Sequence, residues 1–318
     1  LSRKFKTIAT KGNLNNHIGV PLTLLSMDNQ TEFGIVEMGA NHLLEIEFLC
    51  TIANPDYGYI TNFGKAHLEG FGSLEGVIQG KTELYRFLQE KHKLIFLNAD
   101  DDVQKRHENY KHTFSFGESR HADVKLQYES GMPNAQLNYN NTDFISRLTG
   151  NYNATNMAAA LCIGLYFKVE FSEIQKAIEA YSSNNNRSQI IESGSNIIIL
   201  DAYNANPTSM HAALENFKSL KTDKQKIAIL GDMFELGSAA PTEHQVIANY
   251  VKNSDFAESY LVGENFKNTD SNNNLIFRFR DTDHLIEHLE DSDFQDCYFL
   301  IKGSRGMALE RALDSIKK

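Results

Sequence analysis

The sequence predicts an α/β protein of two domains, each built on a mainly parallel β-sheet. Short β-rich runs alternate with longer helical patterns over most of the chain, as expected of parallel strands joined by crossover helices. A segment of short alternating strands interrupts this order once, and the order restarts after a polar stretch at residues 182–188. The length of 318 residues is about twice the ~150 residues of an average domain. We therefore expect domains at residues 1–188 and 189–318.

Elements of the first domain are predicted from the spacing of its apolar residues. Strands are expected at residues 5–10, 33–38, 57–61 and 94–97, and helices at residues 18–27, 43–52, 74–88, 153–167 and 172–181. Residues 113–148 hold short alternating strands broken by Gly, Pro and Asn, which predicts a small antiparallel insert. The expected parallel strands end in small or polar residues, and open α/β sheets bind ligands at this edge.

The second domain repeats the alternation and predicts a second α/β unit. Its strands are expected at residues 197–200, 227–230, 260–262, 275–279 and 298–301, and its helices at residues 209–220, 242–251, 283–289 and 307–316.

Composition argues against several classes of function. The chain has 31 Lys and Arg against 41 Asp and Glu, a net charge of −10, so it lacks the basic excess typical of nucleic-acid binding. The most apolar run, residues 157–167, is shorter than the ~20 residues of a membrane span. Cys50, Cys162 and Cys297 lie far apart, which disfavours a disulfide framework and a zinc site. Since no basic, apolar leader opens the sequence, a cytoplasmic protein is expected.

Two glycine-rich stretches resemble nucleotide-binding motifs but miss their spacing. Gly70, Gly72 and Gly76 resemble a dinucleotide fingerprint, although the third Gly comes one residue late and no strand leads into it. Residues 76–82 resemble a phosphate-binding loop that is one residue short. Because this stretch lies inside an amphipathic helical pattern, we interpret Lys81 as a lysine buried in a helix.

Glu37 and His67 each follow an expected strand. Neighbouring strand ends would place both side chains at one edge of the sheet, where a carboxylate and an imidazole can hold a hard cation together with a phosphate. A capping glutamate and a surface histidine are the alternative.

Three loops carry more polar side chains than a turn needs. Residues 10–21 include Asn15 and Asn16, and a polar substrate loop competes there with a simple helix cap. Residues 201–207 end a strand and lead into a helix. Residues 302–306 form a Gly-rich basic turn before a helix, which suits an anion, with a solvated connecting loop as the alternative.

Together these segments resemble the Mur ligases, in the family's order from one end of the chain to the other. The segments are TKGNLNNHIGVP (10–21), VEMGANH (36–42), ITNFGKAHLEGFGSLEGVIQGKTELY (60–85), NYNATN (151–156), DAYNANPTSM (201–210), LGDMFELG (230–237) with His244, and KGSRGM (302–307). The resemblance implies a central ATPase-type parallel sheet with a small antiparallel insert, followed by a C-terminal Rossmann-like α/β domain. DAYNANP and DMFELG are similar to the member that adds D-alanyl-D-alanine.

The resemblance implies an ATP-driven ligase that joins D-alanyl-D-alanine to UDP-N-acetylmuramoyl-tripeptide through an acyl phosphate, in peptidoglycan precursor synthesis. Glu37 and His67 match magnesium ligands, and Lys81 matches a lysine that the family carbamylates to hold a second Mg²⁺; these three are the expected catalytic residues. Carbamylation requires a neutral amine, and burial would lower the pKa of Lys81 in that direction. ATP contacts are expected from Asn156, Arg187 and Asp201. Contacts to the other substrates are expected from Asn15, Asn16, Tyr203, Asn204, Asn206, Glu235, His244, Lys302, Ser304 and Arg305.

The resemblance has one large departure. The family has an N-terminal domain that grips the uridine nucleotide and then a Gly-Lys-Thr phosphate loop, and neither is recognised in this sequence. The expectation is therefore a pair of central and C-terminal domains that gives no ligase turnover by itself. Two alternatives stay open: a Mur ligase that adds a single amino acid, and a non-catalytic paralogue that binds a nucleotide or the precursor. A monomer is expected.

Overall fold

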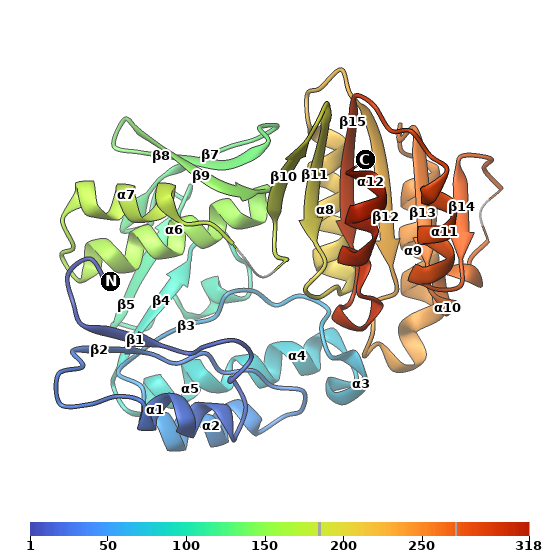
Figure 1. Ribbon diagram of the computed structural model, residues 1–318. Coiled ribbons are helices and arrows are strands. Elements are labelled where there is room, and N and C mark those ends of the chain that lie inside the picture. Colours follow the sequence, from blue (N-terminus) through green and yellow to red (C-terminus); the bar gives the residue numbers. More distant parts are fainter. Residues whose placement is uncertain (184–185, 271, 318) are drawn as a thin grey trace.

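Two α/β lobes lie side by side in the computed structural model, which describes residues 1–183, 186–270 and 272–317 (Figure 1). Residues 184 and 185 of the expected linker lie outside the described residues. Among the residues that are described, none of the helices combines the length and the apolar character needed to span a bilayer.

The first lobe contains three sheets. Strands β3 (Tyr57–Tyr59), β4 (Leu94–Asn98), β5 (Thr113–Gly117) and β6 (Val124–Lys125) form a parallel sheet in that order. Strands β1 (Thr7–Ala9) and β2 (Phe33–Ile35) form a separate parallel pair. Strands β7 (Gln127–Glu129), β8 (Asn134–Tyr139) and β9 (Thr142–Thr149) form an antiparallel sheet. The antiparallel insert therefore begins later than predicted, because an alternating pattern does not reveal which strand a segment pairs with.

Helices of the first lobe follow the predicted order, with one break. They are α1 (Gly19–Leu25), α2 (Glu45–Ala53), α3 (Leu68–Phe71), α4 (Leu74–Lys81), α5 (Glu83–Glu90), the 3₁₀ turn η1 (Gln104–His107), α6 (Asn151–Tyr166) and α7 (Phe171–Ala180). The single helix predicted over residues 74–88 is two helices. The Thr82 hydroxyl donates to the Ile78 carbonyl at 2.8 Å, and such bonding back to the preceding turn bends a helix.

The second lobe is one six-stranded sheet with helices on both faces. Its strands are β10 (Gln189–Ser193), β11 (Asn196–Asp201), β12 (Gln225–Gly231), β13 (Glu258–Val262), β14 (Ile276–Phe279) and β15 (Cys297–Lys302), in the order β10-β11-β15-β12-β13-β14. Only β10, which the sequence did not predict, runs antiparallel to its neighbour. Its helices are α8 (Pro207–Ser219), α9 (Ala240–Lys252), α10 (Glu264–Lys267), α11 (Thr282–Glu290) and α12 (Leu313–Ile316), with 3₁₀ turns η2 (Gly237–Ala239), η3 (Arg305–Met307) and η4 (Leu309–Ala312).

The predicted helix at residues 307–316 is broken into short turns. Ala308 has φ +49°, a left-handed conformation in which an α-helix cannot continue. Two apolar clusters pack on opposite faces of the second sheet. One gathers side chains of α8, α9 and α10, and the other gathers those of α11, η4 and α12.

The strand order brings three polar loops together at one edge of the second sheet. β15 lies between β11 and β12, so the loops that follow these three strands are neighbours. Ser304 joins them: its hydroxyl accepts from the Phe234 N–H at 2.9 Å and donates to the Ala205 carbonyl at 3.4 Å, and its N–H donates to the Asp232 carbonyl at 3.1 Å. Side chains on the three loops are thereby held in one place.

Candidate active site

A buried ion pair occupies this edge of the second sheet. The Lys302 Nζ donates to Oδ2 of Asp201 at 2.6 Å and to the Asn204 carbonyl at 3.3 Å. Lys302 is 2% and Asp201 8% exposed. The other carboxylate oxygen, Oδ1 of Asp201, accepts from the Ser188 N–H at 3.1 Å. Both charges are therefore compensated inside the protein, as buried charges must be.

Arg187 lies on the surface next to this pair. Its guanidinium carbon is 4.0 Å from the centre of the Tyr203 ring, a cation–π contact that holds the exposed side chain in place. The Tyr203 N–H donates to the Asn186 carbonyl at 3.1 Å. An exposed cation is thus fixed where the first lobe passes into the second.

Helix α6 brings Asn156 to the same region from the first lobe. The exposed Asn156 side chain donates through Nδ2 to Oδ1 of Asn153 at 3.2 Å. Asn153 in turn donates through Nδ2 to the Thr149 carbonyl at 2.6 Å and to Oγ of Ser188 at 3.0 Å. Asn156 and Asp201, expected to contact the same nucleotide, are therefore connected through hydrogen bonds.

The metal candidates Glu37 and His67 come from two different segments of the first lobe. Glu37 follows β2 and is exposed; its Oε1 accepts from Nδ2 of Asn15 at 3.1 Å, and its N–H donates to the Thr10 hydroxyl at 2.9 Å. His67 is the residue before α3, and its Nδ1 lies 2.5 Å from Oε2 of Glu235 in the second lobe. His67 and Glu235 both have left-handed backbone, with φ +53° and +61°.

Lys81 ends α4 and is half-buried. Its Nζ donates to the Asn62 carbonyl at 2.7 Å. Burial disfavours the charged ammonium and lowers the pKa of Lys81 to about 8. This is the direction that the sequence predicted for a lysine able to react as a neutral amine.

The donor set of a magnesium site can be compared with the chemistry of these residues. Across the part of the chain that the structure describes, no three His, Cys, Asp or Glu side chains are grouped to hold a metal ion. Mg²⁺ in phosphate-transferring sites is commonly held by one or two carboxylates, with substrate phosphates and water supplying the rest. The exposed carboxylate of Glu37 is a ligand of that kind.

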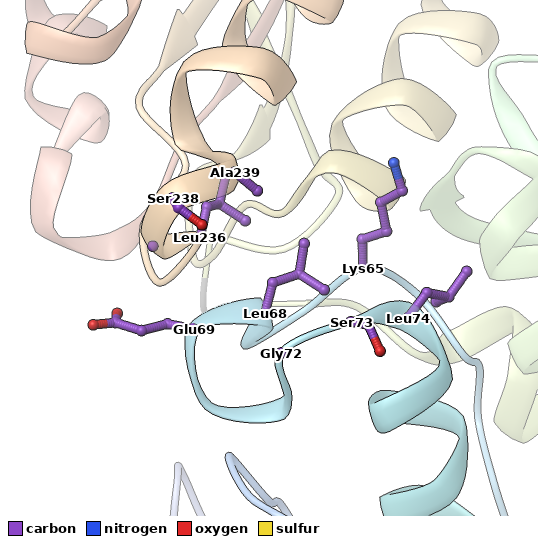
Figure 2. A pocket seen from close by; sticks show the side chains of 10 residues that line it. Lys65, Leu68, Glu69, Gly72, Ser73, Leu74, Leu236, Ser238 and Ala239 are labelled. Atoms are coloured by element: carbon purple, nitrogen blue, oxygen red, sulfur yellow. The ribbon is translucent and has the colours of Figure 1, made fainter.

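A short interface joins the two lobes beside His67. The Lys65 N–H donates to the Thr208 hydroxyl at 2.8 Å, and its Nζ pairs with Glu243 at 2.7 Å. Leu68 packs against the core of the second lobe. Figure 2 shows Leu68 and Lys65 extending toward that lobe across a cavity of about 260 Å³ between the α3–α4 corner and η2.

Several residues expected to contact a substrate also hold loops in place. Oδ1 of Asn16 accepts from the N–H groups of Ile18 and Gly19, both at 3.0 Å, at the start of α1. Asn206 caps α8 through a reciprocal pair of bonds with Ser209. Like Asn16 and Asn206, Ser304 makes hydrogen bonds to groups of the protein itself.

His244 is not available to a substrate, which corrects the expectation of a direct contact. It is 0% exposed; its Nδ1 lies 2.7 Å from the Ala240 carbonyl and its Nε2 accepts from the Met233 N–H at 3.0 Å. Burial lowers the pKa of His244, and a neutral ring with one donor and one acceptor matches these two partners. His244 therefore shapes the loop after β12.

Other candidates keep polar atoms at the surface. Arg305 is exposed and pairs with Glu310 at 2.7 Å. Glu235 is also exposed. Asn204 is exposed as well, and its Oδ1 accepts from the adjacent Ala205 N–H at 2.8 Å. These three side chains lie on the loops that Ser304 holds together.

Sequence reasoning missed the residues that connect the lobes. Tyr152 and Asn153 lie within the quoted NYNATN motif, and Ser188 lies at the end of the polar stretch interpreted as a linker. The signal was present in the motif, because Tyr152 and Asn153 both precede the exposed Asn156 on α6. Nothing in a polar linker distinguishes a buried serine from solvated ones.

Comparison with known proteins agrees with this architecture. Residues 1–164 match the Mur ligase middle domain, and residues 186–305 match the domain described as Mur ligase, glutamate ligase domain. The chain is 31% identical over 329 residues to the UDP-N-acetylmuramoyl-tripeptide--D-alanyl-D-alanine ligase of Bacillus subtilis, covering 99% of this chain and 71% of that protein. It is 32% identical over 328 residues to the ligase of the same description from Rickettsia prowazekii, covering 99% and 73%.

Solved structures show the same similarity. MurF from Acinetobacter baumannii superposes with a TM-score of 0.85 at 30% identity, covering 100% of this chain and 72% of that one. MurF ligase from Thermotoga maritima in complex with ADP superposes with a TM-score of 0.83 at 25% identity, covering 100% and 74%.

Proposed function

The chain belongs to the Mur ligase family, and we propose that it joins D-alanyl-D-alanine to UDP-N-acetylmuramoyl-tripeptide with ATP. The observation that carries this proposal is the region where Asn156 of the first lobe is linked to the Asp201–Lys302 pair of the second. A nucleotide bound there would touch both lobes. The two ligases of Bacillus subtilis and Rickettsia prowazekii, whose descriptions name this reaction, align with nearly the whole chain.

The proposed reaction has two steps. An oxygen of the tripeptide carboxylate attacks the γ-phosphorus of ATP, the bond to the ADP oxygen breaks, and an acyl phosphate forms. The free amine of D-alanyl-D-alanine then attacks the acyl carbon, phosphate leaves, and the nitrogen loses a proton. Two anions must meet in the first step, so positive groups have to neutralise the charge that develops.

The residues that would hold Mg²⁺ are Glu37, His67 and Lys81 as its carbamate. The ion would neutralise phosphate charge when bound. The lowered pKa of Lys81 supports this assignment, since an amine must lose its proton before it can take up carbon dioxide. Asn15 would hold the carboxylate of Glu37 in position through its 3.1 Å hydrogen bond.

The exposed residues on the loops of the second sheet would receive the dipeptide. Arg305 offers a cation for its carboxylate, while Tyr203, Asn204 and Glu235 offer polar contacts. Lys302 would act through Asp201, because its amine is already buried against that carboxylate. We place the reaction in the cytoplasm. We also expect the protein to be a monomer, and sedimentation of the complete gene product would test this oligomeric state.

Phosphate release tests the proposed function. With ATP, Mg²⁺ and the tripeptide precursor, the complete gene product should release phosphate when D-alanyl-D-alanine is added. Single amino acids should give little release, because they lack the second residue that the loops of the second sheet would contact. Equal release with glutamate or another single amino acid would indicate a different Mur ligase. No release with any amine would indicate a binding protein.

Asn206 gives a second prediction, which separates capping from substrate contact. Asn206→Ala should lower the free energy of unfolding by about 1 kcal/mol, the usual loss for an N-cap. The KM for D-alanyl-D-alanine should stay within about twofold, since both bonds of Asn206 are made within α8. Urea unfolding and steady-state kinetics measure the two quantities. A large rise in the KM for D-alanyl-D-alanine with an unchanged free energy of unfolding would indicate that Asn206 contacts the dipeptide.

A further inference from the structure

We propose that Ser188 is a positioning residue that holds the two lobes in the orientation that nucleotide binding requires. This inference rests on the proposed function, because it concerns the nucleotide region named there. Ser188 lies just before β10, at the end of the segment that joins the lobes. Its side chain reaches into the first lobe while its backbone bonds to the second.

The contacts of Ser188 form what we call the Ser188 network, made of Tyr152, Asn153, Ser188 and Asp201. The Ser188 hydroxyl lies 2.9 Å from the Tyr152 hydroxyl and accepts from Nδ2 of Asn153 at 3.0 Å. The Ser188 N–H donates to Oδ1 of Asp201 at 3.1 Å. One residue thus bonds to α6 of the first lobe and to the end of β11 in the second.

Burial makes these bonds significant. Ser188 is 4% and Asn153 6% exposed, so water does not readily replace a lost partner. A buried polar group left without a partner costs ~1–3 kcal/mol. The Asn153 amide is fully committed, with both hydrogens donated and its oxygen accepting from Asn156. Its orientation is therefore set by Ser188 as much as by its own helix.

The backbone of Ser188 adds a second constraint. Its φ of +49° is left-handed, a conformation that few residues other than Gly and Asn adopt without strain. Such strain persists when surrounding contacts determine the conformation, here the bonds to Tyr152, Asn153 and Asp201. The position behaves as a fixed point between the lobes and not as a freely moving linker.

The Ser188 network reaches residues expected near the nucleotide in both lobes. From Ser188 it runs through Asn153 to the exposed amide of Asn156, and through Asp201 to the amine of Lys302. A ligand that contacts both lobes binds best when their orientation is already set, because it does not have to supply that ordering itself. The exposed dipeptide candidates, by contrast, lie on loops of one lobe. Loss of the network should therefore weaken nucleotide binding selectively.

Two substitutions test this in the complete gene product. Ser188→Gly removes the hydroxyl while tolerating the left-handed backbone, and Tyr152→Phe removes the facing hydroxyl while keeping the ring. Each should raise the Kd for ADP and the KM for ATP on the order of 10-fold, the upper range for a lost buried hydrogen bond. The KM for D-alanyl-D-alanine should stay within about twofold. Calorimetry and phosphate release provide the measurements.

The matched control is Ser182→Gly, the same substitution at an exposed serine of the same segment. It should leave the Kd for ADP unchanged. Unchanged nucleotide binding in both Ser188→Gly and Tyr152→Phe would overturn the inference, as would equal weakening by the control. A parallel rise of both KM values would also overturn it, since that is the signature of general destabilisation. If the unaltered protein neither bound ADP nor released phosphate with D-alanyl-D-alanine, the proposed function itself would fail.

Discussion

Lys81→Ala is expected to lower D-alanyl-D-alanine-dependent phosphate release by at least about 100-fold, the usual loss when one electrostatic stabiliser of a transition state is removed. The reason is the environment of the amine, which donates to the Asn62 carbonyl and whose partial burial lowers its pKa to about 8. A neutral amine can take up carbon dioxide and become an anion that holds Mg²⁺. A small carboxylate added to the buffer should partly restore the rate by standing in for that anion. Release of phosphate by the complete gene product gives the measurement.

Lys91→Ala is the control, because Lys91 is exposed at the end of the adjoining helix α5. It should leave the rate unchanged. The pH dependence has a definite sign: the amine of Lys81 is neutral above its pKa of about 8, so the carbamylated fraction at fixed carbon dioxide should rise between about pH 7 and pH 9. Normal turnover by Lys81→Ala would show that Lys81 is only a lysine packed in a helix.

The fold could largely be predicted because parallel sheets leave a strong local pattern. Buried strands such as β15 are apolar over most of their length, here from Cys297 to Ile301, and the helices between them are amphipathic, so their alternation is visible in one sequence. Pairing is not local. The segments at residues 113–117 and 124–125 look like an antiparallel insert, yet the first pairs in parallel with β4 and the second in parallel with the first. The break at Thr82 depends on one hydroxyl and is equally invisible to periodicity.

The candidate site was predictable in its loops but not in the roles of individual residues. The sequence does not distinguish an asparagine that caps a helix from one whose side chain faces solvent. Only the three-dimensional arrangement shows that Asn206 is a cap and that Asn156 is exposed. His244 shows the same limit, because burial under the loop after β12 commits both of its nitrogens. Ser188 is the opposite case. It was interpreted as linker because the stretch around it is polar, and its partners, Tyr152 and Asp201, lie outside that stretch.

The second large effect is expected at the ion pair between β11 and β15. Lys302→Met should lower the free energy of unfolding by about 3–5 kcal/mol, the cost of leaving a buried charge without its partner. Among the described residues, Asp201 would keep the Ser188 N–H as its hydrogen-bond donor, and its carboxylate would stay buried among apolar strands. Nucleotide binding should weaken as well, because the Ser188 network ends on the same carboxylate. Urea unfolding at neutral pH measures the stability.

Two further variants decide whether charge is the cause of that loss. Lys226→Met removes a lysine from the neighbouring strand β12 whose amine donates to the Lys218 and Leu220 carbonyls and attracts the carboxylate of Asp255. Because Lys226 is only part-buried and not paired with a buried carboxylate as Lys302 is, its loss should cost only about 1 kcal/mol. Asp201→Asn combined with Lys302→Met keeps an acceptor for Ser188 but removes both charges, so the double variant should be more stable than Lys302→Met alone. If the double variant were instead as unstable as the sum of the two single variants, packing of the Lys302 chain and not its charge would hold this edge of the sheet.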